Sequence, residues 1–294
     1  MNSFPIAIVG AGPAGLKTAT HLSQRGIDCV VLEEHTKIGL PENCSGLLSI
    51  EGSRKAGLPI EDCMVNQIRG ARLFAPNNTV LSVERQKPIA QLVKRSKLDE
   101  LLAKEAEKNG AKIRLNTRLI DIRKNTLFVE SGGRGEIVKS NIVVGSDGPS
   151  SKTRNLMGIQ STMNDFIHSY QVRAKGSFDS EMVELYLGGF AWNFFAWVIP
   201  ENEESAKVGI GCRVGANPAH AFKTFLREKQ IDIPIKSENS FLIPCAPPIR
   251  KPVREPFILL GDAAYTAKAT TGGGIIMNCK SADILSKCIE DHLQ

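Results

Sequence analysis

The sequence lacks several features that mark large classes of protein. No apolar run approaches the roughly 20 residues that a membrane-spanning helix needs. Residues 1–5 lead into an apolar, strand-like stretch without the basic start of a secretory signal. The 7 cysteines are odd in number and include no C-x-x-C pair, which argues against a disulfide framework or a zinc site. We therefore expect a cytoplasmic protein with reduced thiols and no metal.

A concentrated basic block is also lacking. The net charge of +6 comes from Lys and Arg residues that are spread along all 294 residues, and no motif interleaves aromatic with basic residues. We therefore expect no nucleic-acid partner, and a peripheral contact with an anionic membrane surface stays open. The length and the hydrophobic fraction of 42% fit one large or two interleaved globular domains.

The most informative stretch is near the start of the chain. An apolar strand at 6–9 opens into the G-x-G-x-x-G pattern of Gly10, Gly12 and Gly15. These glycines allow, in order, a tight turn, close approach of a pyrophosphate, and close packing of the following helix on the strand. Glu33 ends the next predicted strand, where a carboxylate accepts hydrogen bonds from ribose hydroxyls and repels a 2′-phosphate. The pattern predicts an unphosphorylated adenosine, as in FAD or NAD, against the alternative of a purely structural turn.

Two further segments follow that could line a long cofactor. The loop 39–49 is rich in Pro, Asn, Ser and Gly, and Cys44 is its one reactive side chain, although a lone Cys is often a small apolar filler. Arg95 precedes Ser96, the predicted cap of a helix that ends at Gly110. Its guanidinium either reaches phosphate or ribityl oxygens or is an ordinary surface group.

The middle of the chain is predicted to be rich in β-strands. A hairpin is expected at 68–83, short strands at 112–129, and further strands within 165–212. A one-step NAD dehydrogenase would alternate strands and helices here, so another class is favoured. The aromatic stretch 190–200 is either core or the wall of an apolar substrate pocket.

The end of the chain returns to cofactor-binding features. A buried strand at 257–260 runs into Gly261 and Asp262, and the glycine loop 270–274 leads into a closing helix at 275–292. Asp262 can accept from a ribityl hydroxyl, and the loop amides with the helix N-terminus can face the electron-rich edge of a flavin.

These elements predict an α/β fold, α+β overall, with two interleaved domains. A Rossmann-like FAD-binding domain with a parallel sheet is expected at 1–67, 93–164 and 245–294. An antiparallel β-sheet domain for the substrate is expected at 68–92 and 165–244.

The cofactor-binding segments resemble the FAD-binding fold of the glutathione-reductase and aromatic-hydroxylase group. Within it, Pro41-x-x-Cys44-Ser45-Gly46, Phe195-x-Trp197-x-Ile199-Pro200 and Gly261-Asp262 with its glycine loop are similar to the geranylgeranyl reductase family. The predicted FAD contacts are Gly10, Gly12, Pro13, Ala14, Gly15, Glu33, Cys44, Ser45, Gly46, Arg95, Leu119, Asp147, Gly148, Gly261, Asp262, Gly273, Gly274 and Ile275.

This resemblance implies reduction of carbon–carbon double bonds in isoprenoid lipids or prenyl diphosphates, with NAD(P)H or ferredoxin as the electron donor. It places Phe195, Trp197 and Pro200 in the substrate cavity, with Phe195 and Ile199 where the family usually has Tyr and Phe. It makes Cys44 the candidate that modulates the flavin or delivers a proton.

Two alternatives stay open. A flavin monooxygenase or halogenase shares the FAD elements, and Trp197-x-Ile199-Pro200 is similar to the halogenase W-x-W-x-I-P motif, although Phe195 replaces its first Trp. A non-enzymatic prenyl-binding escort protein, such as a Rab GDP-dissociation inhibitor, has the same fold, but the intact Glu33 and Asp262 argue against it.

Overall fold

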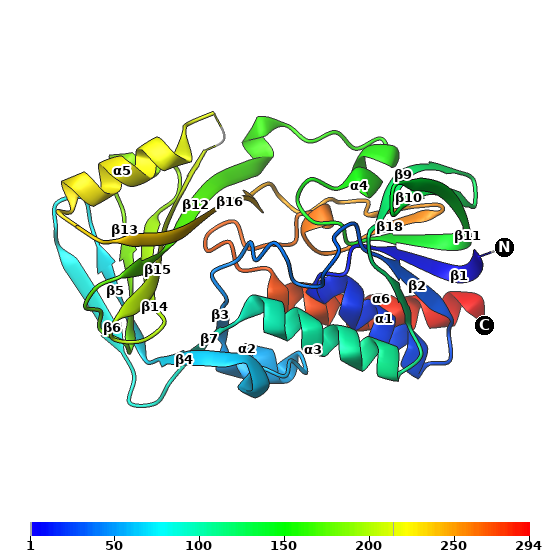
Figure 1. The fold of residues 1–294 in the computed structure, drawn as a ribbon, viewed down its shortest axis with the longest axis horizontal. Coiled ribbons are helices and arrows are strands. Elements are labelled where there is room, and N and C mark those ends of the chain that lie inside the picture. The colour runs from blue at the N-terminus through cyan, green and yellow to red at the C-terminus, as the bar shows by residue number, and fades with distance from the viewer. Residues whose placement is uncertain (1, 214) are drawn as a thin grey trace. The chain divides into compact units, whose positions relative to one another are not determined.

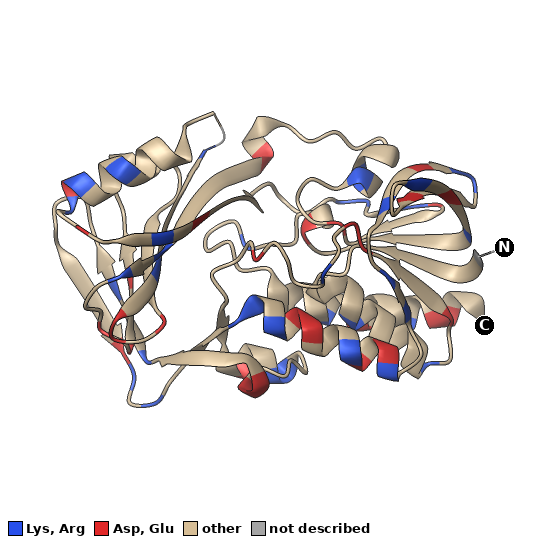
Figure 2. Cartoon of the chain, in the orientation of Figure 1, with Lys and Arg blue, Asp and Glu red and all other residues tan. Residues whose placement is uncertain are grey.

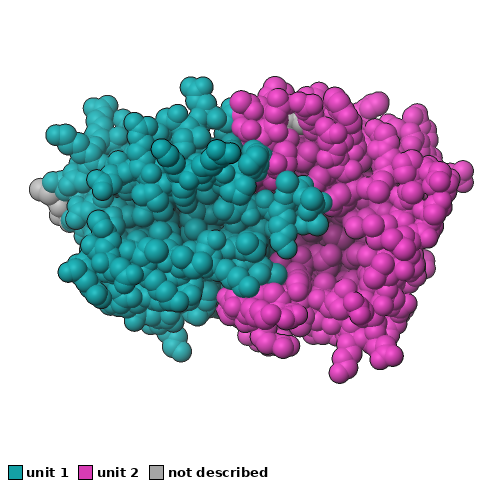
Figure 3. Space-filling view, turned by 180° about the vertical axis from the view of Figure 1, so that it is seen from behind, with its two compact units in different colours: residues 1–41, 96–161, 246–294 teal, residues 42–95, 162–245 magenta. Residues whose placement is uncertain are grey.

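The computed structural model describes residues 2–213 and 215–294. The chain divides into two compact units, and each is assembled from segments far apart in sequence (Figure 3). Unit 1 comprises Met1–Pro41, Ser96–Ser161 and Ala246–Gln294, and unit 2 comprises Glu42–Arg95 and Thr162–Cys245.

Unit 1 is organised around an eight-stranded sheet with the order β17-β18-β11-β1-β2-β8, to which β10 and then β9 are added beside β11. The neighbours β8-β2-β1-β11-β18 are all parallel, whereas β9, β10 and β17 pair antiparallel. The strands are β1 (Asn2–Val9), β2 (Cys29–Leu32), β8 (Lys112–Arg114), β9 (Thr117–Arg123), β10 (Thr126–Ser131), β11 (Arg134–Gly145), β17 (Val253–Arg254) and β18 (Phe257–Leu259).

Helices cover this sheet, and Figure 1 shows three of them, α1, α3 and α6, on one side. The helices are α1 (Pro13–Gln24), α3 (Arg95–Lys108), α4 (Lys152–Leu156) and α6 (Ile275–Leu293). Pro13 suits the first turn of α1 because that position needs no backbone N–H. Arg25 then joins α1 to α6 by ion pairs to Glu290 at 3.0 Å and Asp283 at 3.6 Å.

The core of unit 1 explains why its central strands are almost entirely apolar. Parallel strands covered on both faces read as continuous Val, Ile and Leu runs. Val30, Val143 and Leu127 are fully buried in one cluster, with Phe257 and Leu259 of β18 beside them.

Unit 2 contains a seven-stranded sheet with the order β16-β12-β15-β14-β13-β5-β6 and a separate three-stranded sheet, β3-β7-β4. Pairing in the large sheet is antiparallel except between β13 and β5. The strands are β3 (Leu47–Ser49), β4 (Met64–Ile68), β5 (Gly70–Phe74), β6 (Val80–Glu84), β7 (Ala90–Val93), β12 (Phe166–Lys175), β13 (Met182–Tyr186), β14 (Ala196–Pro200), β15 (Ser205–Arg213) and β16 (Ile235–Pro244).

The two faces of the large sheet bury different partners. On one face Phe222 and Phe225 of α5 (Pro218–Glu228) pack against Val198 and its neighbours. On the other face Trp197 and Ile199 pack against residues of the three-stranded sheet. The remaining short elements are α2 (Ile50–Lys55), η1 (Glu61–Cys63), η2 (Met163–Asp165), η3 (Gly189–Ala191) and η4 (Gly261–Ala264).

The predicted fold class is confirmed, with a parallel sheet in unit 1 and a mainly antiparallel sheet in unit 2. One boundary differs, because 42–67, expected in the cofactor domain, lies in unit 2. The reason is long-range pairing, since β3 and β4 both pair with β7. The helix expected to be capped by Ser96 begins one residue earlier, at Arg95.

Charged residues are interspersed on the helix surfaces. Figure 2 shows acidic and basic positions side by side along α3, as expected for a solvated helix face. Among the residues that the structure describes, no helix is both long enough and apolar enough to cross a bilayer.

Candidate functional site

The candidate nucleotide site lies at one edge of the unit 1 sheet. The parallel strands β2, β1, β11 and β18 all end at this edge, so the residues that follow them come together there. The strand β1 connects through α1 to β2 on one side and pairs with β11 on the other. In open α/β sheets, ligands bind beside such a reversal of strand order, at the carboxyl ends of the strands.

The glycine turn between β1 and α1 has space for a ligand on one side only. Gly10 has a positive φ of +98°, which favours glycine. A Cβ on Gly15 would lie 2.1 Å from the Gly10 carbonyl oxygen, so this position serves internal packing. A Cβ on Gly12 would have no atom of the described residues within 4 Å. Because Gly12 also precedes the first turn of α1, its backbone is placed to approach an anion at the helix N-terminus.

Glu33, directly after β2, is held in one orientation by three contacts. Its Oε2 accepts a hydrogen bond from the Ala11 N–H at 2.7 Å, and its Oε1 accepts from the His35 N–H at 3.0 Å. The His35 ring Nδ1 lies 2.6 Å from the same Oε1. The residue is 9% exposed. The carboxylate is therefore fixed beside the glycine turn.

Asp262 and the second glycine loop meet the N-terminus of α6. The Asn278 Nδ2 donates to the Asp262 Oδ1 at 3.1 Å, and the Thr266 hydroxyl donates to the Asn278 Oδ1 at 2.6 Å. A Cβ on Gly274 would lie 3.0 Å from the Asp262 Oδ1. Asn278 was not among the residues predicted from the sequence, although it is the one polar residue in the first turn of α6, after three apolar residues.

The first glycine turn, residues 10–15, and the segment 261–274 together form what we call the cradle. These two halves of the cradle lie close to each other. A Cβ on Gly261 would lie 3.2 Å from the Cβ of Ala14 in the first turn of α1. Because Glu33 bonds to Ala11 just before α1, the Glu33 and Asp262 segments converge on the same helix start. Gly10, Gly12, Pro13, Ala14, Gly15, Glu33, Gly261, Asp262, Gly273, Gly274 and Ile275 all belong to this part of unit 1.

Asp147 binds the start of α4 through its carboxylate. Its carboxylate accepts from the Ser151 hydroxyl at 2.6 Å, the Thr153 N–H at 2.8 Å and the Thr153 hydroxyl at 3.0 Å, and so binds the first turn of α4 together with its N-cap, Ser151. Gly148 has a φ of +75° with no described atom within 4 Å of a built Cβ. The Leu119 side chain is 4% exposed in the unit 1 core, so only its backbone can face a ligand.

Arg154 connects the turn that follows β11 with the turn that follows β18 by hydrogen bonds. It is 1% exposed, and its guanidinium donates to the Pro149 carbonyl at 2.6 Å and to the Ala263 carbonyl at 3.1 Å. These carbonyls belong to the turns that follow β11 and β18. A buried guanidinium with several acceptors therefore orders Asp262 through its neighbour.

In unit 2, the predicted Cys44 loop is fixed at the two residues that follow the cysteine, Ser45 and Gly46. Gly46 has a φ of +85°, and its carbonyl accepts from the Val93 N–H at 3.0 Å. A Cβ on Gly46 would lie 2.3 Å from the Val93 carbonyl oxygen and 3.6 Å from the Arg95 Cγ. The Ser45 carbonyl accepts from Lys207, and the preceding Cys44 is partly exposed.

The aromatic stretch places one indole flat on the sheet. Trp197 on β14 is 5% exposed, and its Nε1 donates to the Gln171 Oε1 at 3.1 Å, across the intervening β15. This reach is possible because Gly209 lies opposite Trp197, where a Cβ would be 2.4 Å from the indole Cζ2. Phe195 packs edge-on against Trp197 with ring centroids 6.0 Å apart, and is itself stacked on Phe194.

Pro200 does not lie beside Phe195 and Trp197. It follows the strand alternation onto the opposite face, with Val198, and lines a cavity of about 280 Å³ together with Tyr186 and Asp179. Burial and a hydrogen bond to Glu184 raise the pKa of Tyr186 in this cavity. Of the three predicted substrate residues, Phe195 and Trp197 are therefore together and Pro200 is on the other side of the sheet.

Within residues 2–213 and 215–294, no group of three or more His, Cys, Asp or Glu side chains could hold a metal ion. The fitting ligand for unit 1 is instead a dinucleotide. Open space over Gly12, an oriented acid at Glu33 and a second acid at Asp262 suit a pyrophosphate flanked by two sugar-like groups.

The fold and this cradle define a nucleotide-cofactor protein of the open α/β type. A family model described as FAD binding domain matches residues 3–216, so the chain belongs to this FAD-binding family.

Three known proteins are similar to this chain, one in sequence and two in fold. A digeranylgeranylglycerophospholipid reductase of Methanothrix thermoacetophila is 27% identical over 97% of this chain and 77% of its own length. A geranylgeranyl bacteriochlorophyll reductase-like protein from Thermoplasma acidophilum shares the fold with a TM-score of 0.92 and 22% identity, over 100% of this chain and 79% of that one. A flavin-dependent brominase shares it less closely, with a TM-score of 0.77 and 16% identity, over 98% of this chain and 79% of that one.

Proposed function

We propose that this protein is an FAD-dependent oxidoreductase that reduces carbon–carbon double bonds in the geranylgeranyl chains of lipids. The observation that carries the proposal is the convergence of Glu33, the Gly12 turn and Asp262 on the start of α1. The similarity to the digeranylgeranylglycerophospholipid reductase of Methanothrix thermoacetophila supports the substrate class. The protein would therefore act as an enzyme of lipid biosynthesis.

The residues of unit 1 would hold the cofactor. The Gly12 backbone and the N-terminus of α1 would bind the pyrophosphate, Glu33 the adenosine ribose, and Asp262 a ribityl hydroxyl. When bound, FAD supplies hydride chemistry at a carbon–carbon double bond. The chain's own contribution is to orient the cofactor and exclude water.

The residues of unit 2 would act on the substrate. An isolated alkene has no carbonyl to take up charge, so placement and an apolar wall must do much of the work. Trp197 and Phe195 would supply that wall, and the Cys44 thiol would deliver the proton to the second carbon or modulate the flavin. Each reduced double bond then gains one hydride and one proton. NAD(P)H or ferredoxin would resupply the two electrons that leave with the hydride.

A membrane-embedded substrate would require contact with the membrane surface, and we include this peripheral contact in the proposal. It is testable by flotation of the purified protein with vesicles that contain geranylgeranyl lipids.

The decisive experiment is anaerobic. The purified protein is reduced with dithionite, geranylgeranyl lipids are added, and the flavin absorbance and the lipid mass are followed. We expect flavin reoxidation together with a mass gain of two hydrogens per double bond. Reoxidation by oxygen alone, with a hydroxylated or halogenated product, would move the chain to the monooxygenase or halogenase class. A purified protein that takes up no FAD would favour the escort alternative.

A further inference from the structure

Lys207 is a buried cation in the middle of a strand that is otherwise apolar at its centre. It lies on β15, where Ala206, Val208 and Ile210 are fully buried, and it is itself 5% exposed. A buried ammonium is costly unless it is paired and hydrogen-bonded. Its partners therefore indicate what the strand uses it for.

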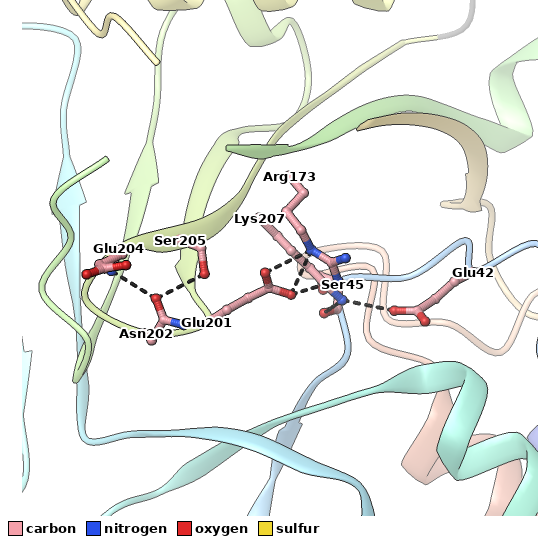
Figure 4. A network of polar contacts seen from close by, with 8 residues as sticks. All are labelled: Glu42, Ser45, Arg173, Glu201, Asn202, Glu204, Ser205 and Lys207. Carbon is pink, nitrogen blue, oxygen red and sulfur yellow. Dashed lines mark hydrogen bonds and ion pairs between the residues drawn. The ribbon is translucent and has the colours of Figure 1, made fainter. Parts of the chain in front are cut away.

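Both partners of Lys207 come from the Cys44 loop. Its Nζ lies 3.1 Å from the Glu42 Oε1 and 2.9 Å from the Ser45 carbonyl oxygen, to which it donates hydrogen bonds (Figure 4). These two residues flank Asn43 and Cys44. One side chain thus binds the loop on both sides of the thiol.

A second strand binds the same loop. Asn239 on β16 donates from its Nδ2 to the Glu42 carbonyl oxygen at 3.0 Å. Asn239 pairs with Gln171, which in turn pairs with Gly209 beneath the Trp197 indole. Since directly paired residues share a sheet face, the loop is bound on the face that carries the aromatic wall.

We propose that Lys207 is a positioning residue that holds the Glu42–Ser45 segment on the sheet and so gives the Cys44 thiol a single place beside the aromatic wall. The inference deepens the proposed function, because it assigns the element that orders the candidate proton donor. Lys207 acts through the loop and does not itself touch the reacting atoms.

A neighbouring ion pair provides a matched control. Arg173 is the cross-strand partner of Lys207 and pairs with Glu201, with Nε to Oε2 at 2.8 Å. Figure 4 shows Glu201 in the turn that Asn202 and Ser205 close, at the end of β14. Arg173→Met therefore removes a cation from the same face but leaves the contacts of Lys207 and Asn239 to the Cys44 loop in place.

The test measures the reactivity of Cys44 and needs neither substrate nor electron donor. The FAD-loaded protein and its Lys207→Met and Arg173→Met variants are treated with N-ethylmaleimide, and the modification rate of each cysteine is followed by peptide mass spectrometry. We expect Lys207→Met to label Cys44 about tenfold faster, which corresponds to about 1.4 kcal/mol of lost ordering. Cys288, which is exposed on α6, provides the internal reference, and Arg173→Met should leave Cys44 within about twofold of the parent, a margin well inside that tenfold step.

Two outcomes would overturn the proposal. The first is an unchanged Cys44 rate in Lys207→Met. The second is an equal rise at Cys44 and at the buried Cys29, Cys212 and Cys279, which would mean general destabilisation. A milder variant, Asn239→Ala, keeps the test valid if Lys207→Met folds poorly. It should speed Cys44 labelling about threefold, which in free energy is roughly half of the effect expected for Lys207→Met. An unchanged rate would count against the proposal.

Rescue and turnover separate this inference from the proposed function. Lys207→Arg keeps a charge that can reach Glu42 and should restore the slow labelling rate. If the protein reduces lipids, Lys207→Met should lower kcat with little change in KM. If the parent reduces no lipid but the labelling pattern holds, the proposed substrate fails while the role of Lys207 stands.

Discussion

The two units of this chain order their candidate residues by different means. In unit 1, backbone geometry does the work, through glycine turns at the ends of parallel strands and amide groups directed at the Glu33 carboxylate. In unit 2, long side chains reach across strands, as Trp197 does to Gln171 and Lys207 to Glu42. Backbone arrangements fail abruptly when a Cβ intrudes, whereas side-chain arrangements weaken by degrees. Substitutions in unit 1 should therefore affect cofactor binding, and those in unit 2 should affect turnover.

The largest effect is expected at the first glycine turn, where two adjacent motif positions should behave differently. Gly15→Ala places a Cβ 2.1 Å from a backbone oxygen and should destabilise the apoprotein by about 3 kcal/mol. Gly12→Ala meets open space and should leave apoprotein stability within about 0.5 kcal/mol, yet weaken FAD binding roughly 100-fold. Thermal unfolding of the apoprotein and fluorescence titration with FAD check both expectations. Equal melting temperatures for the two variants would contradict this account of the turn.

The next comparison sets one residue of each unit against the other. Asp262→Ala removes the acceptor that Asn278 orients, so most of the bound FAD should be lost on purification. Cys44→Ser should retain FAD at the parental ratio but change turnover. The ratio of flavin to protein absorbance measures the first effect, and lipid reduction measures the second. Equal loss of FAD in both variants would show that the Cys44 loop serves cofactor binding instead.

A smaller effect is expected on the sheet of unit 2. Gly209→Ala forces the indole away from a Cβ that would lie 2.4 Å from its Cζ2, breaking the bond to Gln171 at a cost of about 1–3 kcal/mol. FAD content should be unchanged, while the Trp197 fluorescence shifts and lipid turnover falls about tenfold. Gly189→Ala is the matched control, since no described atom lies within 4 Å of its added Cβ. If both alanine variants behave alike, Gly209 does not determine the position of the Trp197 indole.

The smallest effect concerns the pairing of α1 with α6. Burial, with Lys17 and Arg25 nearby, lowers the pKa of His21 below its usual 6.5, against the opposing pull of Asp283. Because the folded-state pKa is depressed, the unfolded chain binds more protons than the folded chain near pH 6. The contribution of His21 to the free energy of unfolding is therefore fully present above pH 6.5 and is lost as the pH falls through the folded pKa. His21→Gln should flatten this dependence of the melting temperature between about pH 5 and 7. A parental slope retained in the variant would assign the dependence to another group.

The sequence predicted unit 1 better than unit 2 for a physical reason. Strand, glycine turn, helix and second strand are contiguous from β1 to β2, so their spacing can be read directly. The aromatic stretch was left open between core and pocket wall. The structure shows Trp197 packed against the three-stranded sheet with the partly buried Phe195 beside it, whereas Pro200 lies on the opposite face of the strand. Alternating residues of a strand point to opposite faces, so residues that are close in the motif are separated in space.

The boundary of the cofactor domain shows the same limit. Residues 42–67 follow β2 in sequence and were expected to belong to the same domain. Their partners lie elsewhere, since β3 and β4 pair with β7 and the preceding loop bonds to β15 and β16. Sequence proximity could not reveal partners contributed by later parts of the chain.

The sequence by itself determined the βαβ cradle, the fold class and the FAD-binding family, because these depend on local spacing of glycines, apolar runs and one acid. Only the tertiary structure decided that Asn278 orients Asp262, that Gly209 seats the Trp197 indole and that Lys207 holds the Cys44 loop. Lys207 and Glu42 are 165 positions apart, and a contact over that distance leaves no periodicity in the sequence. It exists because the chain folds two remote segments onto one sheet face, where a buried charge must find its partner.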